Sequence, residues 1–208
     1  MSLAAGERRA LSELFDQVGP DAATLCAGWT TRDLAAHLVV REGRPDASVG
    51  ILAPPLARYT ARVQRSVAQR SWPELVEQVR SGPPWWSLLR MPALGDKLNA
   101  VEFFVHHEDV RRATLGWEAR PADPHRAAAL WEVLCLLARL YYRKSPVGVV
   151  LRRPDGVQRT ARQGSNSVTV IGAPEELVLH ANGRDQALVQ VEGAHADVAG
   201  LQGSPRGF

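Results

Sequence analysis

Apolar side chains recur every three or four residues through the first two-thirds of the chain, and this spacing places them on one face of a helix. Leu11 and Phe15 show the pattern in the first such segment. Thr30, followed by Asp33 three residues later, has the pattern of a capping box, which marks a helix start, and Ser71 begins a second one. The pattern predicts helices at 4–18, from 30 to the residue before Pro45, at 55–70, at 71–80, at 96–114, and from the break at Pro121 and Pro124 to about residue 143.

The pattern changes after Pro146, where short β-rich runs replace the helical spacing. The sequence Pro-Asp-Gly at 154–156 is a turn signal between two of these runs. Strands are predicted at 147–152, 157–162, 167–171 and 187–191, with short helices from Pro174 and near 195–201. We therefore predict an α+β fold with two domains, a helical bundle at 1–145 and a small α+β domain at 146–208.

Composition and charge are those of an ordinary globular protein and argue against several functional classes. The chain has 25 basic and 22 acidic residues, and because the arginines are interleaved with acidic residues, nucleic acid is not expected as a partner. No apolar run reaches the roughly 18 residues that a membrane-spanning helix requires, so no membrane association is expected. The first residues lack a secretory pattern, and we expect a cytoplasmic location.

The two cysteines, Cys26 and Cys135, do not form a C-x-x-C pair, which argues against a disulfide framework and against a thiolate zinc site. Cys135 lies in an apolar run and is interpreted as a small core residue. Cys26 comes just before a predicted helix, where partial exposure would be expected. Its role, as a redox group, as a ligand or as neither, stays open.

The most informative chemical pattern is a carboxylate and an imidazole four residues apart, at Glu102 and His106. On a helix this spacing brings both side chains onto one face, with Cβ atoms about 5–6 Å apart, so that the pair can hold one divalent ion. Leu98 and Val105 share the stripe and indicate that this face is buried. A buried glutamate needs a cationic partner, which here is either an arginine or a metal ion.

His37 is the third candidate ligand, because it lies in another helical segment beside the apolar Leu34 and Leu38. If the two helices pack together, His37, Glu102 and His106 form a two-histidine, one-carboxylate set, as in several catalytic zinc sites. Three alternatives stay open: a solvated surface pair of Glu102 and His106, a core histidine at position 37, and an arginine partner for Glu102. The other histidines are expected to lie off the site or at the surface: His107, His125, His180 and His195.

Four segments carry a resemblance to a known family. They are CAGWTTRDLAAHL at 26–38, NAVEFFVHHEDVRRA at 99–113, PVGVVLRR at 146–153 and VTVIGAPEEL at 168–177. The chain resembles the actinobacterial metal-binding proteins that are related to mycothiol-dependent maleylpyruvate isomerase, within the DinB-like superfamily. The first two segments together are fairly specific, and the resemblance covers most of the chain.

The resemblance implies an N-terminal DinB-like four-helix bundle and a small C-terminal α+β domain similar to sterol carrier proteins. It also implies a metal ion, usually zinc, held by His37, Glu102 and His106, although the same ligands would suit nickel(II) or iron(II). We therefore expect a divalent-metal-binding protein, a zinc-dependent enzyme that uses a low-molecular-weight thiol such as mycothiol in transfer or isomerisation. The expected partners are a small-molecule thiol or electrophile, and the chain would be a monomer or a homodimer.

In this enzyme hypothesis Asp109 does not bind the ion but orients one of the metal ligands by a hydrogen bond. Asp33 either does the same for His37 or only caps its helix. The loop at 81–95, with Trp85 and Trp86, either roofs the pocket or is anchored by apolar contacts. Two other hypotheses stand beside it. The first is a non-catalytic metal-binding module, such as a sensor or an interaction domain, and the second is a carrier of a small apolar ligand built on the C-terminal domain.

Overall fold

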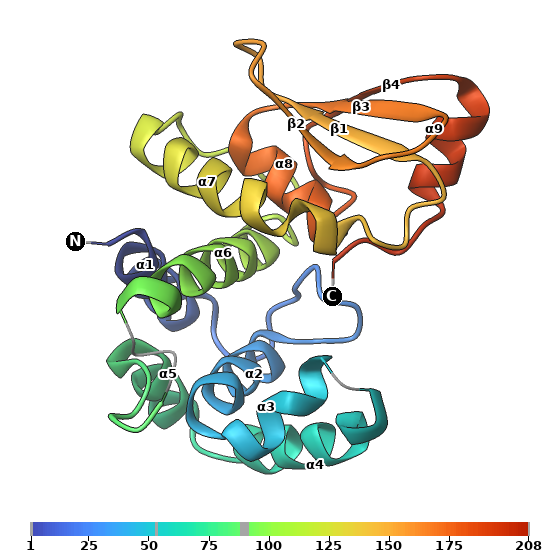
Figure 1. Ribbon diagram of the computed structural model, residues 1–208. Helices are drawn as coiled ribbons and strands as arrows, with labels where there is room; N and C mark the ends of the chain where they lie inside the picture. The colour runs from blue at the N-terminus through green and yellow to red at the C-terminus, as the bar shows by residue number, and fades with distance from the viewer. Residues whose placement is uncertain (1, 53, 88–91, 208) are drawn as a thin grey trace. The chain divides into compact units, whose positions relative to one another are not determined.

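The computed structural model describes residues 2–52, 54–87 and 92–207, and the chain separates into two compact units, Met1–Ala119 and Arg120–Phe208 (Figure 1). The first unit is helical, and the second contains the four strands of the described chain together with three helices. The predicted α+β class is therefore confirmed. No helix within these described ranges is long and apolar enough to cross a lipid bilayer.

The first unit is built on a bundle of four helices. The helices described in this unit are α1 (Leu3–Val18), α2 (Thr31–Gly43), α3 (Pro45–Leu52), α4 (Ala57–Ala68), α5 (Trp72–Ser81) and α6 (Pro92–Arg111). Helix α1 packs against α5 and α6, and α2 packs against α5. Helices α3 and α4 are added on α2, outside the four-helix bundle that the sequence predicted.

A capping box fixes the start of helix α2. The backbone N–H of Thr30 donates to Oδ2 of Asp33 at 3.0 Å, as the sequence pattern predicts. The helix ends at Gly43, directly before the Arg44–Pro45 pair, because the residue preceding a proline is disfavoured in the helical conformation. These two ends set the position of His37 in the middle of the helix.

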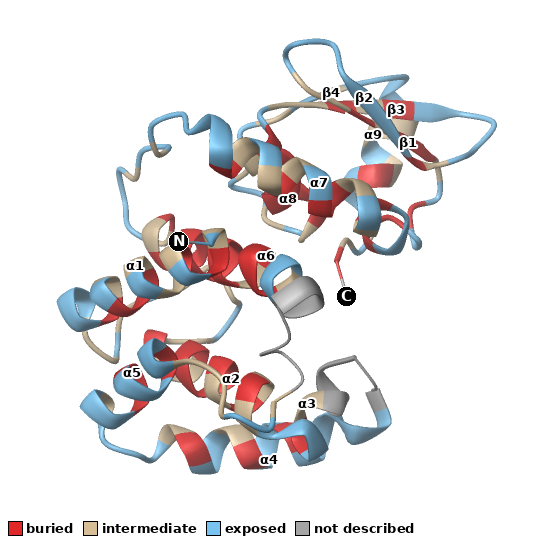
Figure 2. Ribbon diagram, turned by 60° about the vertical axis from the view of Figure 1, so that its left-hand side comes forward, coloured by how far each residue is buried: buried red, intermediate tan, exposed pale blue. Residues whose placement is uncertain are grey.

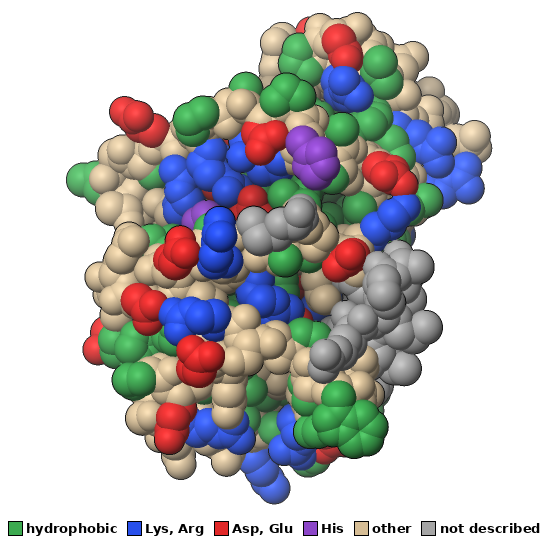
Figure 3. Space-filling model, turned by 90° about the vertical axis from the view of Figure 1, so that its left-hand side faces the viewer, with side chains coloured by type: hydrophobic (Ala, Val, Ile, Leu, Met, Phe, Trp, Pro, Cys, Tyr) green, Lys and Arg blue, Asp and Glu red, His purple; other side chains and the backbone are tan. Residues whose placement is uncertain are grey.

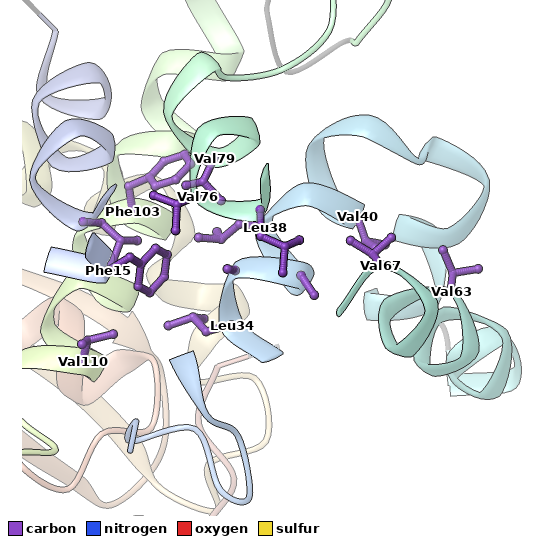
Figure 4. Packing of buried hydrophobic residues seen from close by; sticks show 14 of the residues in the cluster. Phe15, Leu34, Leu38, Val40, Val63, Val67, Val76, Val79, Phe103 and Val110 are labelled. Carbon is purple, nitrogen blue, oxygen red and sulfur yellow. The ribbon is translucent and has the colours of Figure 1, made fainter. Parts of the chain in front are cut away.

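Buried apolar side chains of all six helices described in this unit form one cluster, and those of α1, α2, α5 and α6 meet in the core of the bundle (Figure 4). Leu34 and Leu38 of α2 pack with Phe15 of α1, Val76 of α5 and Phe103 of α6, and all five are essentially inaccessible to solvent. Burying each such side chain contributes about 1.5–3 kcal/mol. Because Leu38 and Phe103 directly follow His37 and Glu102 in sequence, this packing also brings those two polar side chains close together.

The second unit is a four-stranded sheet with helices packed against it. Strand β1 (Gly148–Arg152) is antiparallel to β2 (Gln158–Arg162) and parallel to β3 (Ser167–Ile171), which is antiparallel to β4 (Gln190–Glu192), so the order is β2-β1-β3-β4. The alternate residues Val149, Leu151, Val168 and Val170 are fully buried, which places them on one face of the sheet. Figure 2 colours the chain by burial. The helices of this unit are α7 (Pro124–Tyr141), α8 (Pro174–Ala181) and α9 (His195–Gln202).

Helix α7 belongs to the second unit, so the division between the units lies earlier in the chain than predicted. The sequence placed it in the bundle and put the boundary at 145/146, whereas the structure divides the chain after Ala119. The buried face of α7, which includes Leu130 and Leu134, packs against α8 and β2. The helical spacing of apolar residues showed that α7 has a face to bury, but it did not show which unit covers that face.

Prolines account for two further differences from the predicted elements. Helix α2 stops before Pro45 as predicted, but Pro45 also opens a helix that the sequence analysis does not predict, α3, because a proline is tolerated in the first turn, where its missing N–H has no intrahelical acceptor. Pro92 opens α6 for the same reason, four residues before the predicted start at 96. Strand β4 is also shorter than the predicted 187–191 and begins only at Gln190.

Acidic side chains lie among the basic ones on the face drawn in Figure 3. Several surface arginines are paired with a carboxylate at 2.7 Å, namely Arg44 with Asp46, Arg80 with Glu77, and Arg152 with Glu192. Such exposed pairs contribute at most about 1 kcal/mol each to stability. They show how acidic side chains neutralise some of the surface arginines.

Candidate metal centre

The three predicted ligands meet at one carboxylate oxygen. Oε1 of Glu102 lies 3.2 Å from Nε2 of His37 and 3.3 Å from Nε2 of His106. One ligand atom from each side chain lies within 4.8 Å of the other two. Glu102 and His106 share a face of α6 because they are one turn apart, and the packing of α2 against the same core brings in His37.

The spacing of these atoms fits a divalent ion. Zinc binds imidazole nitrogen and carboxylate oxygen at about 2.0–2.2 Å, so two ligands at a tetrahedral angle lie roughly 3.3–3.5 Å apart. The two contacts of Glu102 Oε1 are close to that separation. Nitrogen, nitrogen and oxygen donors also suit first-row transition metals generally. Among the described residues the group has three members, which is the number of protein ligands that catalytic zinc sites use.

The metal-free centre holds opposite charges in a buried place. Burial opposes ionisation of Glu102, but the charge of Arg41 and hydrogen bonds from His106 and His37 outweigh it and hold the pKa of Glu102 well below its ordinary value. Burial also opposes a charge on His106, yet its bonds to Asp109, Cys26 and Glu102 together raise the pKa of His106 well above the ordinary value. Glu102 is therefore a carboxylate that faces an imidazolium when no ion is bound.

His37 behaves differently from His106. Its burial lowers the pKa of His37 and outweighs the bond to Glu102, so the ring stays neutral at physiological pH. The ring also contacts that of Trp29, with centroids 5.1 Å apart, and that of His106, at 5.3 Å. A neutral imidazole is the form that binds a metal ion. If the centre binds an ion, the neutral His37 can bind it without a net loss of a proton, whereas His106 must release one.

Arg41 provides the arginine partner that was one of the open alternatives for Glu102. Its Nε atom lies 3.3 Å from Oε1 of Glu102, and its Nη1 donates to Oδ1 of Asn99 at 2.7 Å. Arg41 is one turn after His37 on α2, and Asn99 is one turn before Glu102 on α6. The arginine and the two histidines therefore surround the same carboxylate, and the sequence spacing did not identify which arginine this would be.

Asp109 and Cys26 lie on the other side of the His106 ring. Oδ2 of Asp109 is 2.8 Å from Nδ1 of His106, and Sγ of Cys26 is 3.3 Å from Oδ2 of Asp109 and 4.0 Å from Nδ1 of His106. The three residues form a second group of side chains with the composition of a metal site. The sequence analysis expects Asp109 to orient a ligand, and its bond to His106 is consistent with that role. The place of Cys26 is not predicted, because no spacing rule connects it with a residue 80 positions later.

Asp33 and the loop at 81–95 are two further candidates for a role at the centre. The contacts of Asp33 are those of the capping box, with the backbone and hydroxyl of Thr30, which favours the capping interpretation.

Trp85 and Trp86 are 80% and 56% exposed and contact one another edge to face. Residues 88–91 lie outside the described residues, so the suggestion that this loop roofs the pocket stays a prediction.

The remaining histidines have separate environments. His107 is buried and its Nδ1 lies 2.9 Å from Oε2 of Glu7, away from the centre on the next face of α6. The prediction that His180 lies at the surface is wrong: its Nδ1 lies 2.7 Å from the hydroxyl of Tyr142, and both side chains are buried. His125 and His195 are exposed, as the sequence predicted.

The helical unit and the four-stranded sheet give the chain an α+β fold that it shares with solved structures. One solved structure with this fold is the crystal structure of the mycothiol-dependent maleylpyruvate isomerase, with a TM-score of 0.62 and 15% sequence identity over 91% of this chain and 90% of that chain. A histidine-to-alanine mutant of that enzyme gives a TM-score of 0.61 and 14% identity over the same shares. No family model and no curated protein matches the chain. The resemblance inferred from sequence segments is thus confirmed for the fold.

Proposed function

We propose that the chain binds one divalent metal ion through Nε2 of His37, Oε1 of Glu102 and Nε2 of His106. The observation that carries the proposal is the convergence of both imidazole nitrogens on a single carboxylate oxygen, at 3.2 and 3.3 Å, in a largely buried place. Separate helices of the bundle supply these groups, as is common for metal sites in helical bundles. Zinc is the ion that we propose, with nickel(II) and iron(II) as the other candidates.

We further propose that the protein is an enzyme that uses a low-molecular-weight thiol similar to mycothiol, in transfer or isomerisation. Support comes from the fold shared with a mycothiol-dependent isomerase and from a ligand group that has three members among the described residues. A divalent ion in such a site lowers the pKa of a thiol or water that binds to it and so supplies a nucleophile at neutral pH.

The chain's own residues would have distinct roles in this function. Glu102 and the neutral His37 present their ligand atoms without loss of a proton, since the pKa of each lies below its ordinary value. Asp109 accepts from Nδ1–H of His106 and keeps Nε2 of that ring directed at Glu102. The exposed part of Glu102, about 25% of its side chain, marks the side from which a small molecule would approach.

The experiment that tests metal binding compares the wild-type protein with His106→Ala, and with His125→Ala as a control at an exposed histidine. After dialysis against zinc and removal of free metal, elemental analysis should find about one equivalent in the wild type and in the control, and a loss of at least tenfold in His106→Ala. Equal metal content in all three proteins would overturn the assignment. A mycothiol-dependent turnover of electrophiles by the zinc-loaded protein tests the second part of the proposal.

The alternative of a non-catalytic metal-binding module makes a different prediction. It requires a fourth protein ligand that closes the coordination shell. Among the described residues Cys26 and Asp109 are candidates, but they contact Nδ1 of His106 rather than the nitrogen that faces Glu102. This geometry favours the enzyme.

A cytoplasmic location and a monomeric or homodimeric state remain predictions from the sequence.

A further inference from the structure

Strand β2 forms one edge of the sheet in the second unit (Figure 1). It pairs with β1 on one side, and no backbone hydrogen bond reaches its other side from the residues that the structure describes. Residues 158–160 of this strand are exposed. The outer side of β2 therefore presents N–H and C=O groups to solvent, and such an edge is a template for a further strand.

Two arginines of β2 start from the buried face of the sheet, at its edge. Arg159 is paired across the strands with Leu151, and Arg162 is paired with Val149. Both partners are fully buried, and side chains of directly opposed residues point to the same face. Since α7 packs against β2, the two arginines extend between the strand and this helix.

Helix α7 continues this line of positive charge. Burial raises the pKa of Cys135, and the charge of Arg159 counteracts that rise, which places Arg159 near this residue of α7. About two turns later, the carbonyl of Arg143 accepts from Nη1 of Arg162 at 2.7 Å. Arg139 lies midway between these two contacts, about one turn from each. The arginines of the strand and the helix thus lie side by side.

These side chains lack the acidic partners that other arginines of the sheet have. Arg152 of the neighbouring strand β1, for example, is paired with Glu192 at 2.7 Å. Within the described ranges, the cations that have no carboxylate partner on this surface form a basic row: Arg139, Arg143, Lys144, Arg159 and Arg162. The second unit therefore does not neutralise the basic row itself.

Two leucines add apolar area beside the basic row. Leu136 and Leu140 are one turn apart on α7 and are 66% and 40% exposed. Leu136 directly follows Cys135, and Leu140 directly follows Arg139, so the apolar pair runs alongside the arginines. Exposed apolar area rimmed by charged residues is typical of interaction sites.

We propose that the edge of β2 and the exposed side of α7 form a docking surface for an acidic, extended segment of a partner protein. The segment adds a strand beside β2, and its carboxylates face the basic row. A second copy of β2 does not fit, because it would bring like charges opposite one another. A polypeptide fits the open edge better than another polyanion, since its backbone supplies alternating N–H and C=O groups.

The experiment titrates fluorescent peptides into the full chain and follows their anisotropy. The acidic peptide has about seven residues, in which glutamate alternates with valine, and its counterpart has lysine in place of glutamate. Two further acidic peptides carry N-methyl groups, one on alternate peptide bonds and the other on the remaining ones. Because successive N–H groups of a strand point to opposite sides, only one of these peptides has its methyl groups against β2.

The protein variants are the double variant Arg139→Gln/Arg159→Gln and the control Arg62→Gln, which changes an exposed arginine of α4. The wild type and the control should bind the acidic peptide about tenfold or more tightly than the lysine peptide. The double variant should lose about five- to tenfold in affinity for the acidic peptide. One N-methylated peptide should bind as the parent does, and the other should lose about tenfold or more. Amide exchange of residues 158–162 should slow when the acidic peptide binds.

Several results would overturn the proposal. They are no binding of the acidic peptide, equal binding of the two N-methylated peptides, and equal affinity of the wild type and the double variant. Tighter binding of a single-stranded oligonucleotide or of phosphatidylserine vesicles would assign the surface to another partner. Self-association that the double variant abolishes, measured by light scattering, would assign it to a second copy. If the double variant does not fold, the N-methylated peptides and the wild type decide.

Discussion

Oδ2 of Asp109 lies 2.8 Å from Nδ1 of His106, so the carboxylate and the imidazole form a hydrogen-bonded pair one turn apart on α6. Asp109 is completely buried and accepts on the side of the ring that is opposite Glu102. This contact determines which nitrogen of His106 faces the candidate centre. A carboxylate behind a histidine ligand fixes the ring orientation and increases the basicity of the nitrogen that binds the ion.

We predict that Asp109→Asn weakens metal binding about 10- to 100-fold without unfolding the protein. The amide has the shape of the carboxylate but lacks its charge, so the His106 ring is held less firmly and is a weaker base. Competition with a chromophoric chelator measures the affinity, and circular dichroism checks the fold. Asp21→Asn, at an exposed position of the same unit, is the matched control. An affinity that is the same in both variants would contradict the role given to Asp109.

Metal binding should depend on pH because His106 is protonated in the metal-free centre. Its bonds to Asp109, Cys26 and Glu102 outweigh burial and raise the pKa of His106 well above the ordinary value, so below that pKa an ion must displace a proton from Nε2. The affinity is therefore expected to rise with pH, by about tenfold per unit for one proton released, and to level off above the pKa of His106.

Two measurements check this pH dependence. The affinity for zinc is determined at several pH values with a correction for the chelator, and proton release is followed with an indicator dye in weakly buffered solution. About one proton per ion is expected from His106 below its pKa, since His37 and Glu102 bind in the forms already present. A metal affinity that does not change with pH would show that His106 is not the protonated ligand.

Most of the helical unit could be predicted because its signals are local. The capping box at Thr30 and Asp33 fixed the start of α2, and the four-residue spacing of Glu102 and His106 fixed their common face. What could not be predicted depends on contacts between distant residues. The place of Cys26 beside His106 and the choice of Arg41 as the partner of Glu102 come from helix packing, which no spacing in the sequence encodes.

The predicted boundary at 145/146 and the predicted exposure of His180 differ from the structure for the same physical reason. Apolar spacing in α7 shows that a face is buried but not that it packs against α8 and β2. His180 lies in a helix of apolar residues, and its burial follows from a hydroxyl partner, Tyr142, that is 38 positions away. A polar side chain is predicted at the surface unless its partner is known, and partners distant in sequence are not visible in the local pattern.

The pair of His180 and Tyr142 predicts how the second unit responds to acid. Burial and the charge of Arg206 lower the pKa of His180 from 6.5 to about 4, while burial raises the pKa of Tyr142, so the phenol donates to the neutral ring. The pKa of His180 is thus about 6.5 in the unfolded chain and about 4 in the folded one, so between pH 4 and 6.5 the unfolded chain binds more protons. The stability contributed by this group is therefore complete above pH 6.5 and is lost as the pH falls toward 4, by an amount on the order of 3 kcal/mol.

Hydrogen exchange of the amides in β1 and β3, measured between pH 7 and 4 and corrected for intrinsic rates, reports the stability of this unit. The wild type should lose protection across that range. His180→Gln, which cannot be protonated, should lose much less, and His195→Gln, at an exposed position of the same unit, should behave as the wild type. Equal losses in His180→Gln and the wild type would assign the acid sensitivity to other groups.

Arg8 and Glu42 join α1 to α2 in the bundle. The two side chains form a paired, charge-assisted contact, with Nη1 of Arg8 2.8 Å from Oε2 of Glu42, and both are largely buried. Nη1 also donates to the carbonyl of Val79 in the last turn of α5 at 2.7 Å, and the guanidinium lies 4.0 Å from the ring centre of Phe103. One arginine thus contacts three other helices, and its removal would leave a buried carboxylate without a partner.

We predict that Arg8→Met destabilises the first unit by about 3–5 kcal/mol, because the charge of Glu42 stays buried and unpaired. Adding Glu42→Leu should recover a large part of this loss, since the double variant removes both charges and keeps apolar volume in their place. The loss that remains is attributed to the carbonyl of Val79, which no longer receives its hydrogen bond. Urea unfolding of the wild type, the two single variants and the double variant completes the cycle. If the double variant is as unstable as the sum of the single ones, Arg8 stabilises the bundle through its contacts with Val79 and Phe103 and not through Glu42.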